Sequence, residues 1–161
     1  MCDANLDFVN HCHPEILNVL HYWRSKCGTR RMPSRADIDP IELRHFIANM
    51  LIVEILPQED GSHDYVYRLV GTREAEARGY DPTGHRVAES FFGRSRELAL
   101  RNYDITADRQ VPHFDSVRYT TKDGLQRDDE ELFLPLSDEG VIVNRILVYV
   151  ITTMVPLREQ R

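Results

Sequence analysis

Histidine and cysteine side chains gather near the start of the chain, where they could bind a metal ion. They are His11, Cys12, His13, His21 and Cys27. Their spacing lacks the paired CxxC or HxxxH ligands of tetrahedral zinc sites. Cys27 also falls on the apolar stripe of a predicted helix. We therefore favour a core cysteine beside a polar arm over a metal site.

The second cluster that could carry out chemistry is a run of four consecutive acids, Asp128, Asp129, Glu130 and Glu131. Paired carboxyls can run acid–base chemistry when one of them is desolvated. Neighbouring residues on a strand point to opposite faces, so at least two of the four should lie in water. We favour a solvated strand start, which would also discourage edge-to-edge pairing.

No catalytic signature appears elsewhere. The sequence has no G-x-S-x-G elbow, P-loop, Rossmann glycine cluster or HExxH motif. His45, His85 and His113 are separate, and none has a clear axial-ligand context for haem. We predict that the chain is not an enzyme, and we expect neither haem nor metal.

The bulk composition limits the partners and the compartment. The net charge of −6 disfavours nucleic acid, because phosphate neutralisation needs a basic face. No apolar run reaches the roughly 18 residues of a membrane span. The N-terminus lacks the basic and apolar regions of a signal peptide. Three cysteines form no obvious disulfide framework, so we predict a cytoplasmic protein.

Apolar periodicity predicts an α+β fold with an antiparallel sheet. A helix is predicted to begin at Pro14, with Ile16, Leu20, Trp23 and Cys27 as one apolar stripe. A second helix should begin at Asp39-Pro40. Strand patterns cover five stretches, residues 50–56, 65–70, 114–120, 128–136 and 145–155.

The stretch from Tyr65 to Gly84 combines a strand, a short helix and a turn. Gly71 ends the strand, Thr72 is the expected N-cap, and Gly79 should close the helix with a positive φ. Asp81-Pro82-Thr83-Gly84 fits a type I turn. We predict that Gly79 and Gly84 are backbone requirements and do not bind a ligand.

This stretch, YVYRLVGTREAEARGYDPTG, resembles the second strand and first helix of a PAS domain. It resembles one bacterial PAS-like family in particular, through YWR at 22–24 with RRMPSRADIDP at 30–40, YRLVGT at 67–72 and LPLSDEG at 134–140. The resemblance covers roughly residues 20–154. It implies a PAS-like five-stranded antiparallel sheet with flanking short helices and an N-terminal helical extension.

The implied organisation is a flexible arm (1–12), the helical extension (13–49), the PAS-like domain (50–156) and a tail (157–161). PAS domains sense or relay signals, so we expect a stand-alone regulatory module in signal transduction, without its own output domain, that acts on a separate signalling protein by contact. The alternative is a PAS domain kept mainly for ligand sensing, and an enzyme is a distant third. Fold alone names neither ligand nor partner.

A ligand pocket is predicted between the inner face of the sheet and the helices after the second strand. Its expected wall is Tyr65, Tyr67, Leu69, Phe91, Phe92, Tyr103, Phe114 and Leu132. That wall is apolar and aromatic, with no inward cluster of Lys or Arg, and suits a small apolar or aromatic molecule. The alternative is that these side chains fill the space. All cysteines precede the PAS core, so we do not expect a flavin-reactive cysteine.

Two surface features complete the predictions. Arg68 lies opposite the tyrosine face and should form a surface ion pair, with Glu131 as a candidate partner. The stripe of Ile16, Leu20 and Trp23 lies on an element beyond the PAS core and predicts a homodimer interface. Its alternative is packing over the sheet of the same chain.

Overall fold

The computed structural model describes residues 6–92, 95–121 and 123–156 and shows a five-stranded antiparallel sheet. The strands lie in the order β2-β1-β5-β4-β3, with antiparallel pairing throughout. Their bounds are β1 Met50–Pro57, β2 His63–Val70, β3 His113–Thr120, β4 Gln126–Leu136 and β5 Arg145–Met154. The predicted fold class is confirmed.

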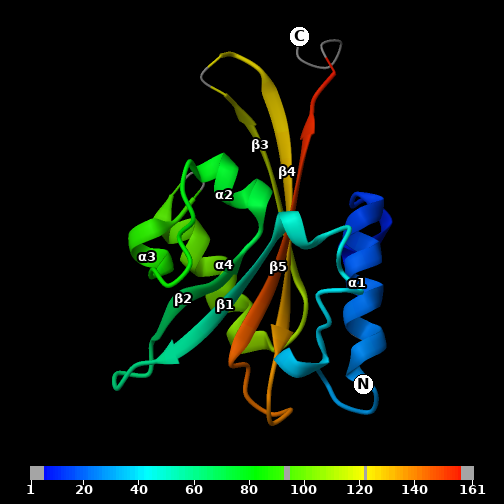
Figure 1. Cartoon of the computed structure of the whole chain (residues 1–161), viewed down its shortest axis with the longest axis vertical. Helices are drawn as coiled ribbons and strands as arrows, with labels where there is room; N and C mark the ends of the chain where they lie inside the picture. Colours follow the sequence, from blue (N-terminus) through cyan, green and yellow to red (C-terminus); the bar gives the residue numbers. More distant parts are fainter. Residues whose placement is uncertain (1–5, 93–94, 122, 157–161) are drawn as a thin grey trace.

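Helices cover the two faces of the sheet unequally (Figure 1). The helices α2 (Thr72–Arg78), α3 (Val87–Ser90) and α4 (Arg96–Arg109) lie on one side, called here the inner face. The N-terminal helix α1 (Pro14–Cys27) lies on the other side, the outer face. Within the described ranges, no helix is both long enough and apolar enough to cross a membrane.

The apolar stripe of α1 packs against the sheet of its own chain. Ile16 and Leu20 have no exposed surface and Trp23 is 1% exposed. The stripe meets the outer-facing leucines of β4, which are Leu132, Leu134 and Leu136. Its prediction as a homodimer interface is therefore wrong, because side chains buried within one chain offer no surface to a second copy.

The segment before α1 also packs on the outer face. A short 3₁₀ helix spans Asp7–Asn10, and its Phe8 stacks on Phe114 with 4.8 Å between ring centroids. The predicted flexible arm therefore contributes Phe8 to the core, with Leu6, Val9 and Cys12 packed beside it. Stacking removes both rings from water, which offsets the entropy of ordering this stretch.

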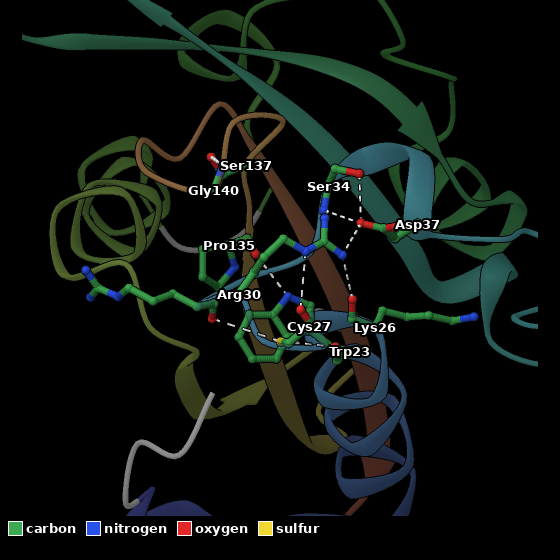
Figure 2. A network of polar contacts seen from close by, with 10 residues as sticks. Trp23, Lys26, Cys27, Arg30, Ser34, Asp37, Pro135, Ser137 and Gly140 are labelled. Carbon is green, nitrogen blue, oxygen red and sulfur yellow. Dashed lines mark hydrogen bonds and ion pairs between the residues drawn. The ribbon is translucent and has the colours of Figure 1, made fainter. Parts of the chain in front are cut away.

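The segment between α1 and β1 is built from turns. The helix predicted to begin at Asp39-Pro40 is replaced by turns and a 3₁₀ helix at Ile47–Asn49. Before it, a 3₁₀ turn at Arg35–Asp37 begins with a capping box between Ser34 and Asp37. The Asp37 carboxylate also pairs with Arg30 at 2.9 Å, as Figure 2 shows.

Two hydrogen bonds connect α1 and the segment after it to the end of β4. The Trp23 indole N–H donates to the Pro135 carbonyl at 2.9 Å, a bond visible in Figure 2. The Ser137 N–H donates to the Pro33 carbonyl at 2.9 Å. Trp23 and Pro33 belong to the first sequence motif, and Pro135 and Ser137 to the last. The two motifs therefore meet in space, and their contacts hold the outer layer on the sheet.

A β-bulge interrupts β2. Tyr67 pairs with Val53 and Leu69 with Ile52, so Arg68 is one extra residue on this strand. The strict alternation expected from Tyr65 to Leu69 fails at this point. Tyr67 faces inward, whereas Leu69 turns to the outer face.

The turn after β2 differs in detail from its prediction. Gly71, and not Thr72, is the N-cap of α2. A Cβ atom on Gly71 would lie 2.3 Å from the Ile47 and Ala48 carbonyl oxygens, so glycine is needed for close approach. Gly79 has φ 82° at the C-cap and Gly84 has φ 87°, as a backbone requirement predicts.

The next turn is hydrogen-bonded one residue later than expected. The His85 N–H donates to the Pro82 carbonyl at 2.9 Å, and Gly84 donates to the Tyr67 carbonyl. The Asp81 carboxylate accepts from the Thr83 N–H within the turn. These contacts hold the start of α3 against β2.

Candidate functional site

A chamber of about 280 Å³ lies between the inner face of the sheet and helices α2 and α4. Its lining comes from all these elements: Leu51, Tyr67, Glu74, Ala77, Arg78, Phe92, Ala99, Tyr103, Tyr119, Arg127, Asp129, Glu131, Phe133, Val148, Val150 and Thr152. A pocket was predicted at this place, and the structure contains one.

Three of the predicted pocket residues line the chamber. They are Tyr67 from β2, Tyr103 from α4 and Phe92. The guanidinium carbon of Arg78 lies 5.7 Å from the centre of the Tyr67 ring and 4.9 Å from that of Phe92. This cation–π arrangement holds Arg78 at the chamber wall.

The other five predicted pocket residues lie elsewhere. Tyr65 lies behind the wall, its ring 5.1 Å from that of Tyr103 and its hydroxyl bonded to Asp104. Phe91 is 38% exposed. The remaining three face the outer side, namely Leu69, Phe114 and Leu132.

Two buried charges from α2 enter the chamber. Arg78 donates to the Glu74 carboxylate at 2.9 Å, and the two side chains are 5% and 10% exposed. Burial raises the pKa of Glu74 more than the attraction of Arg78 lowers it. The spacing of four residues places both side chains on one face of the helix.

Acids from β4 form the chamber floor. Asp129 accepts from the Thr152 hydroxyl at 2.6 Å, and burial raises the pKa of its carboxyl despite nearby Arg127. Burial raises the pKa of Glu131 to about 7, and the negative charges of Asp129 and Asp115 add to this. None of the described residues donates a hydrogen bond to the Glu131 carboxyl.

The prediction of an apolar and aromatic wall without inward cations is therefore wrong. Arg78 and Arg127 point inward beside three carboxyls, so the chamber is polar as well as aromatic. The four consecutive acids are all partly buried, which contradicts the solvated strand start. The other two members also have partners: Asp128 pairs with Arg118 at 2.6 Å, and Glu130 accepts from the His13 N–H at 2.9 Å.

The inward direction of Asp129 and Glu131 could have been predicted from the face of the sheet on which the β4 leucines lie. Leu132, Leu134 and Leu136 needed an apolar cover, and the stripe of α1 is the largest one in the sequence. Placing the leucines on the outer face sends Asp129 and Glu131 inward, because strand residues alternate. The sequence interpretation missed them because it placed Leu132 on the inner wall.

The other candidate residues do not form a site. No group of three or more histidine, cysteine or acidic side chains among the described residues could hold a metal ion. Cys12 lies near Glu130 and Cys27 is in α1, so both are on the outer side of the sheet. Neither lines the chamber.

A shallow, open recess of about 380 Å³ lies on the outer face. It is lined by Arg35, Ile52, Glu54, Arg68, Leu69 and Arg145. Arg68 forms its ion pair here with Glu54, and not with Glu131 on the opposite face. Since both partners are partly exposed, the pair contributes at most about 1 kcal/mol.

Comparison with known proteins identifies the family. No curated protein matches the sequence. Similar solved structures include a light-oxygen-voltage domain studied with a flavin analogue (15% identity, TM-score 0.47, covering 74% of this chain and 86% of that one). Another is the LOV domain of the Erythrobacter litoralis EL346 blue-light activated histidine kinase (13% identity, TM-score 0.44, covering 66% and 95%).

The family assignment itself rests on the sequence. A family model described as "PAS domain" matches residues 11–150, which is most of the chain and includes α1 as well as the sheet. The chain therefore belongs to the PAS domain family.

Proposed function

We propose that this PAS domain is a signalling sensor whose input is a small molecule bound in the chamber and whose output is contact with a regulatory partner. The observation that carries the proposal is the chemistry of the chamber wall. Charged side chains from α2 and β4 surround a space of about 280 Å³ beside aromatic rings.

A fold kept only as a scaffold has no reason to retain such an interior. Burying a charged group costs several kcal/mol unless it gains partners. Apolar side chains of similar volume would fill the space at a lower cost in free energy. The chamber is also close to the lower end of the volumes that small-molecule sites occupy, roughly 300 Å³. These features support a small polar ligand.

The ligand would contact the sheet and its helical cover together. Glu74 and Arg78 are on α2, Ala99 and Tyr103 on α4, and Glu131 on β4. A molecule that touches all three elements changes how the helices pack on the sheet. This is a route by which binding could alter the surface shown to a partner.

A second candidate is a pure interaction module without a ligand. Val141 and Ile142, adjacent residues in the loop between β4 and β5, are 66% and 69% exposed. Exposed apolar residues can mark a contact surface. The same residues serve the output step of the sensor, so the two candidates differ only in whether the chamber is used.

A thermal-shift screen with a chamber-filling variant distinguishes them. Ala99→Phe should fill the chamber from α4, whereas Leu98→Phe places the same ring on a residue that is 46% exposed. A ligand at 100 times its Kd stabilises the folded state by about 2.7 kcal/mol. For a chain of this size, that raises the Tm by roughly 5–10 °C.

The sensor proposal expects this rise in the wild type and in Leu98→Phe, and its loss in Ala99→Phe. If a broad metabolite panel shifts none of the proteins, the interaction module is correct. An equal shift in Ala99→Phe would place the ligand outside the chamber.

A further inference from the structure

We infer that the chamber binds a small organic cation, with the protonated amine of the ligand on the Glu131 carboxylate and its body against the tyrosine rings. This inference rests on the proposed function, because it names the chemical class of the ligand at the same site. The argument comes from the charge balance of the wall, the unpartnered state of Glu131, and the aromatic surfaces around it.

Among the described residues, inward carboxyls outnumber inward cations. The carboxyls are Glu74, Asp115, Asp129 and Glu131, and the guanidinium groups are Arg78 and Arg127. Three of these carboxyls, Glu74, Asp129 and Glu131, line the chamber with the two guanidinium groups, so with every group ionised the wall carries one more negative than positive charge. An anionic ligand would meet net repulsion, whereas a cation would reduce the imbalance.

The carboxyls other than Glu131 already have partners within the protein. Glu74 pairs with Arg78. Asp129 accepts from Thr152 and is stabilised by the nearby charge of Arg127.

Asp115, opposite Glu131 on β3, is also satisfied, because it accepts from the Asn102 amide at 2.9 Å. Glu131 alone has no donor among the described residues. An ionised buried carboxylate without a donor costs free energy, so this carboxyl needs either a proton or a cation from outside.

The walls beside Glu131 suit a cation with an apolar body. Tyr67, Tyr103 and Tyr119 line the chamber together with Phe92 and Phe133. Ring faces attract cations, including ammonium groups. The Arg78 guanidinium already lies over the Tyr67 ring. The volume of about 280 Å³ admits an amine with a short chain or a single ring and excludes a dinucleotide.

Binding of the amine should release a proton. Glu131 titrates at a pKa of about 7. The groups that face it are Glu74 and Arg78 from α2, Asp115 and Tyr119 from β3, Arg127 and Asp129 from β4, Tyr67 from β2 and Tyr103 from α4. When the carboxyl is protonated, R–NH₃⁺ displaces H⁺ to solvent and forms the ion pair with the carboxylate. Affinity should therefore rise with pH through neutrality.

The test uses matched probes that differ only in the polar head. Isothermal titration at pH 8 compares 2-phenylethylamine, 2-phenylethanol and 3-phenylpropanoate, and then butylamine, butanol and pentanoate. We expect the amine of at least one series to bind 10-fold or more tighter than its alcohol and acid. In wild type, its affinity should fall roughly 30-fold from pH 8 to pH 5.5, as the ionised fraction of a group with pKa about 7 falls.

Glu131→Gln should lose at least 10-fold in amine affinity at pH 8 and lose the pH dependence. The control Glu139→Gln changes an exposed carboxyl in the β4–β5 loop and should leave both unchanged. The wild-type pH profile needs no variant, so the test remains decisive if Glu131→Gln does not fold.

The inference is overturned if alcohols or acids bind as well as amines, if no amine binds, or if affinity does not depend on pH. The proposed function survives each of these results when another class of compound gives a thermal shift that Ala99→Phe abolishes. The proposed function fails when no compound of any class gives a thermal shift that Ala99→Phe abolishes.

Discussion

Replacing Glu131 by glutamine should stabilise the unliganded protein at alkaline pH and leave it almost unchanged near pH 4.5. The reason is the unpartnered carboxyl on the chamber floor. In the folded chain its pKa is about 7, against an ordinary value of 4.5. Between these values the folded state holds a proton that the unfolded state has released.

The sign follows from this proton difference. Below pH 4.5 both states are protonated, and the carboxyl contributes no penalty. As pH rises toward 7 the unfolded state ionises first, so the folded state loses stability, and the loss is complete above about pH 8. The full rise in pKa corresponds to about 3 kcal/mol. Since the chamber is open to water, we expect between about 1 and 3 kcal/mol.

Urea unfolding at pH 4.5 and pH 8 measures the effect. The difference in free energy of unfolding between Glu131→Gln and wild type should be near zero at pH 4.5 and favour the variant at pH 8. Titrating groups that do not interact with residue 131 contribute equally to both proteins and cancel. Glu139→Gln should show no such change. If glutamine at 131 destabilises the protein at pH 8, the carboxyl has a donor in the folded state and the charge argument is wrong.

Three further predictions concern the scaffold. Gly71→Ala should lower the Tm by several degrees, because its Cβ would lie 2.3 Å from two backbone oxygens; a wild-type melting curve would refute this close approach. Trp23→Phe should cost roughly 1–3 kcal/mol in urea titration, because the Pro135 carbonyl loses its donor; an unchanged midpoint would show that the bond contributes nothing. Gly79→Val should cost about 1–2 kcal/mol at its positive φ without changing ligand affinity, and a matched loss of affinity would contradict a purely structural role.

The strands and the N-terminal helix could be predicted from sequence because their signals are local. Alternation, continuous apolar runs and β-branched composition located the five strands to within a few residues. Pro14 marked the start of α1. These patterns depend on backbone geometry that neighbouring residues determine.

The wall of the chamber depended on information that alternation does not carry. One extra residue at Arg68 reverses the face of Leu69, and a bulge leaves no clear trace in a single sequence. Which β4 residues face the chamber depends on which helix covers the leucines of this strand. Once α1 covers Leu132 and its neighbours, Glu131 must point inward, so a single misplaced strand face changed the predicted site from charged to apolar.

The packing of α1 illustrates the same limit. The stripe of Ile16, Leu20 and Trp23 showed that a surface would be buried, but its partner could be a second chain or the sheet. The bond from Trp23 to Pro135 joins residues 112 positions apart, and only the folded chain brings them together. The stripe was wrong as a dimer interface because the same chain supplies the cover.

The most direct test of ligand binding in the chamber is a titration followed by ¹H–¹⁵N NMR with the strongest compound from the thermal-shift screen. The account predicts that the amide shifts cluster on β2, α2, α4 and the inner-facing part of β4, around Tyr67, Tyr103 and Glu131. The same compound should leave the spectrum of Ala99→Phe nearly unchanged, because this substitution fills the chamber from α4. Shifts confined to α1 and the outer recess, or equal shifts in the filled variant, would contradict it.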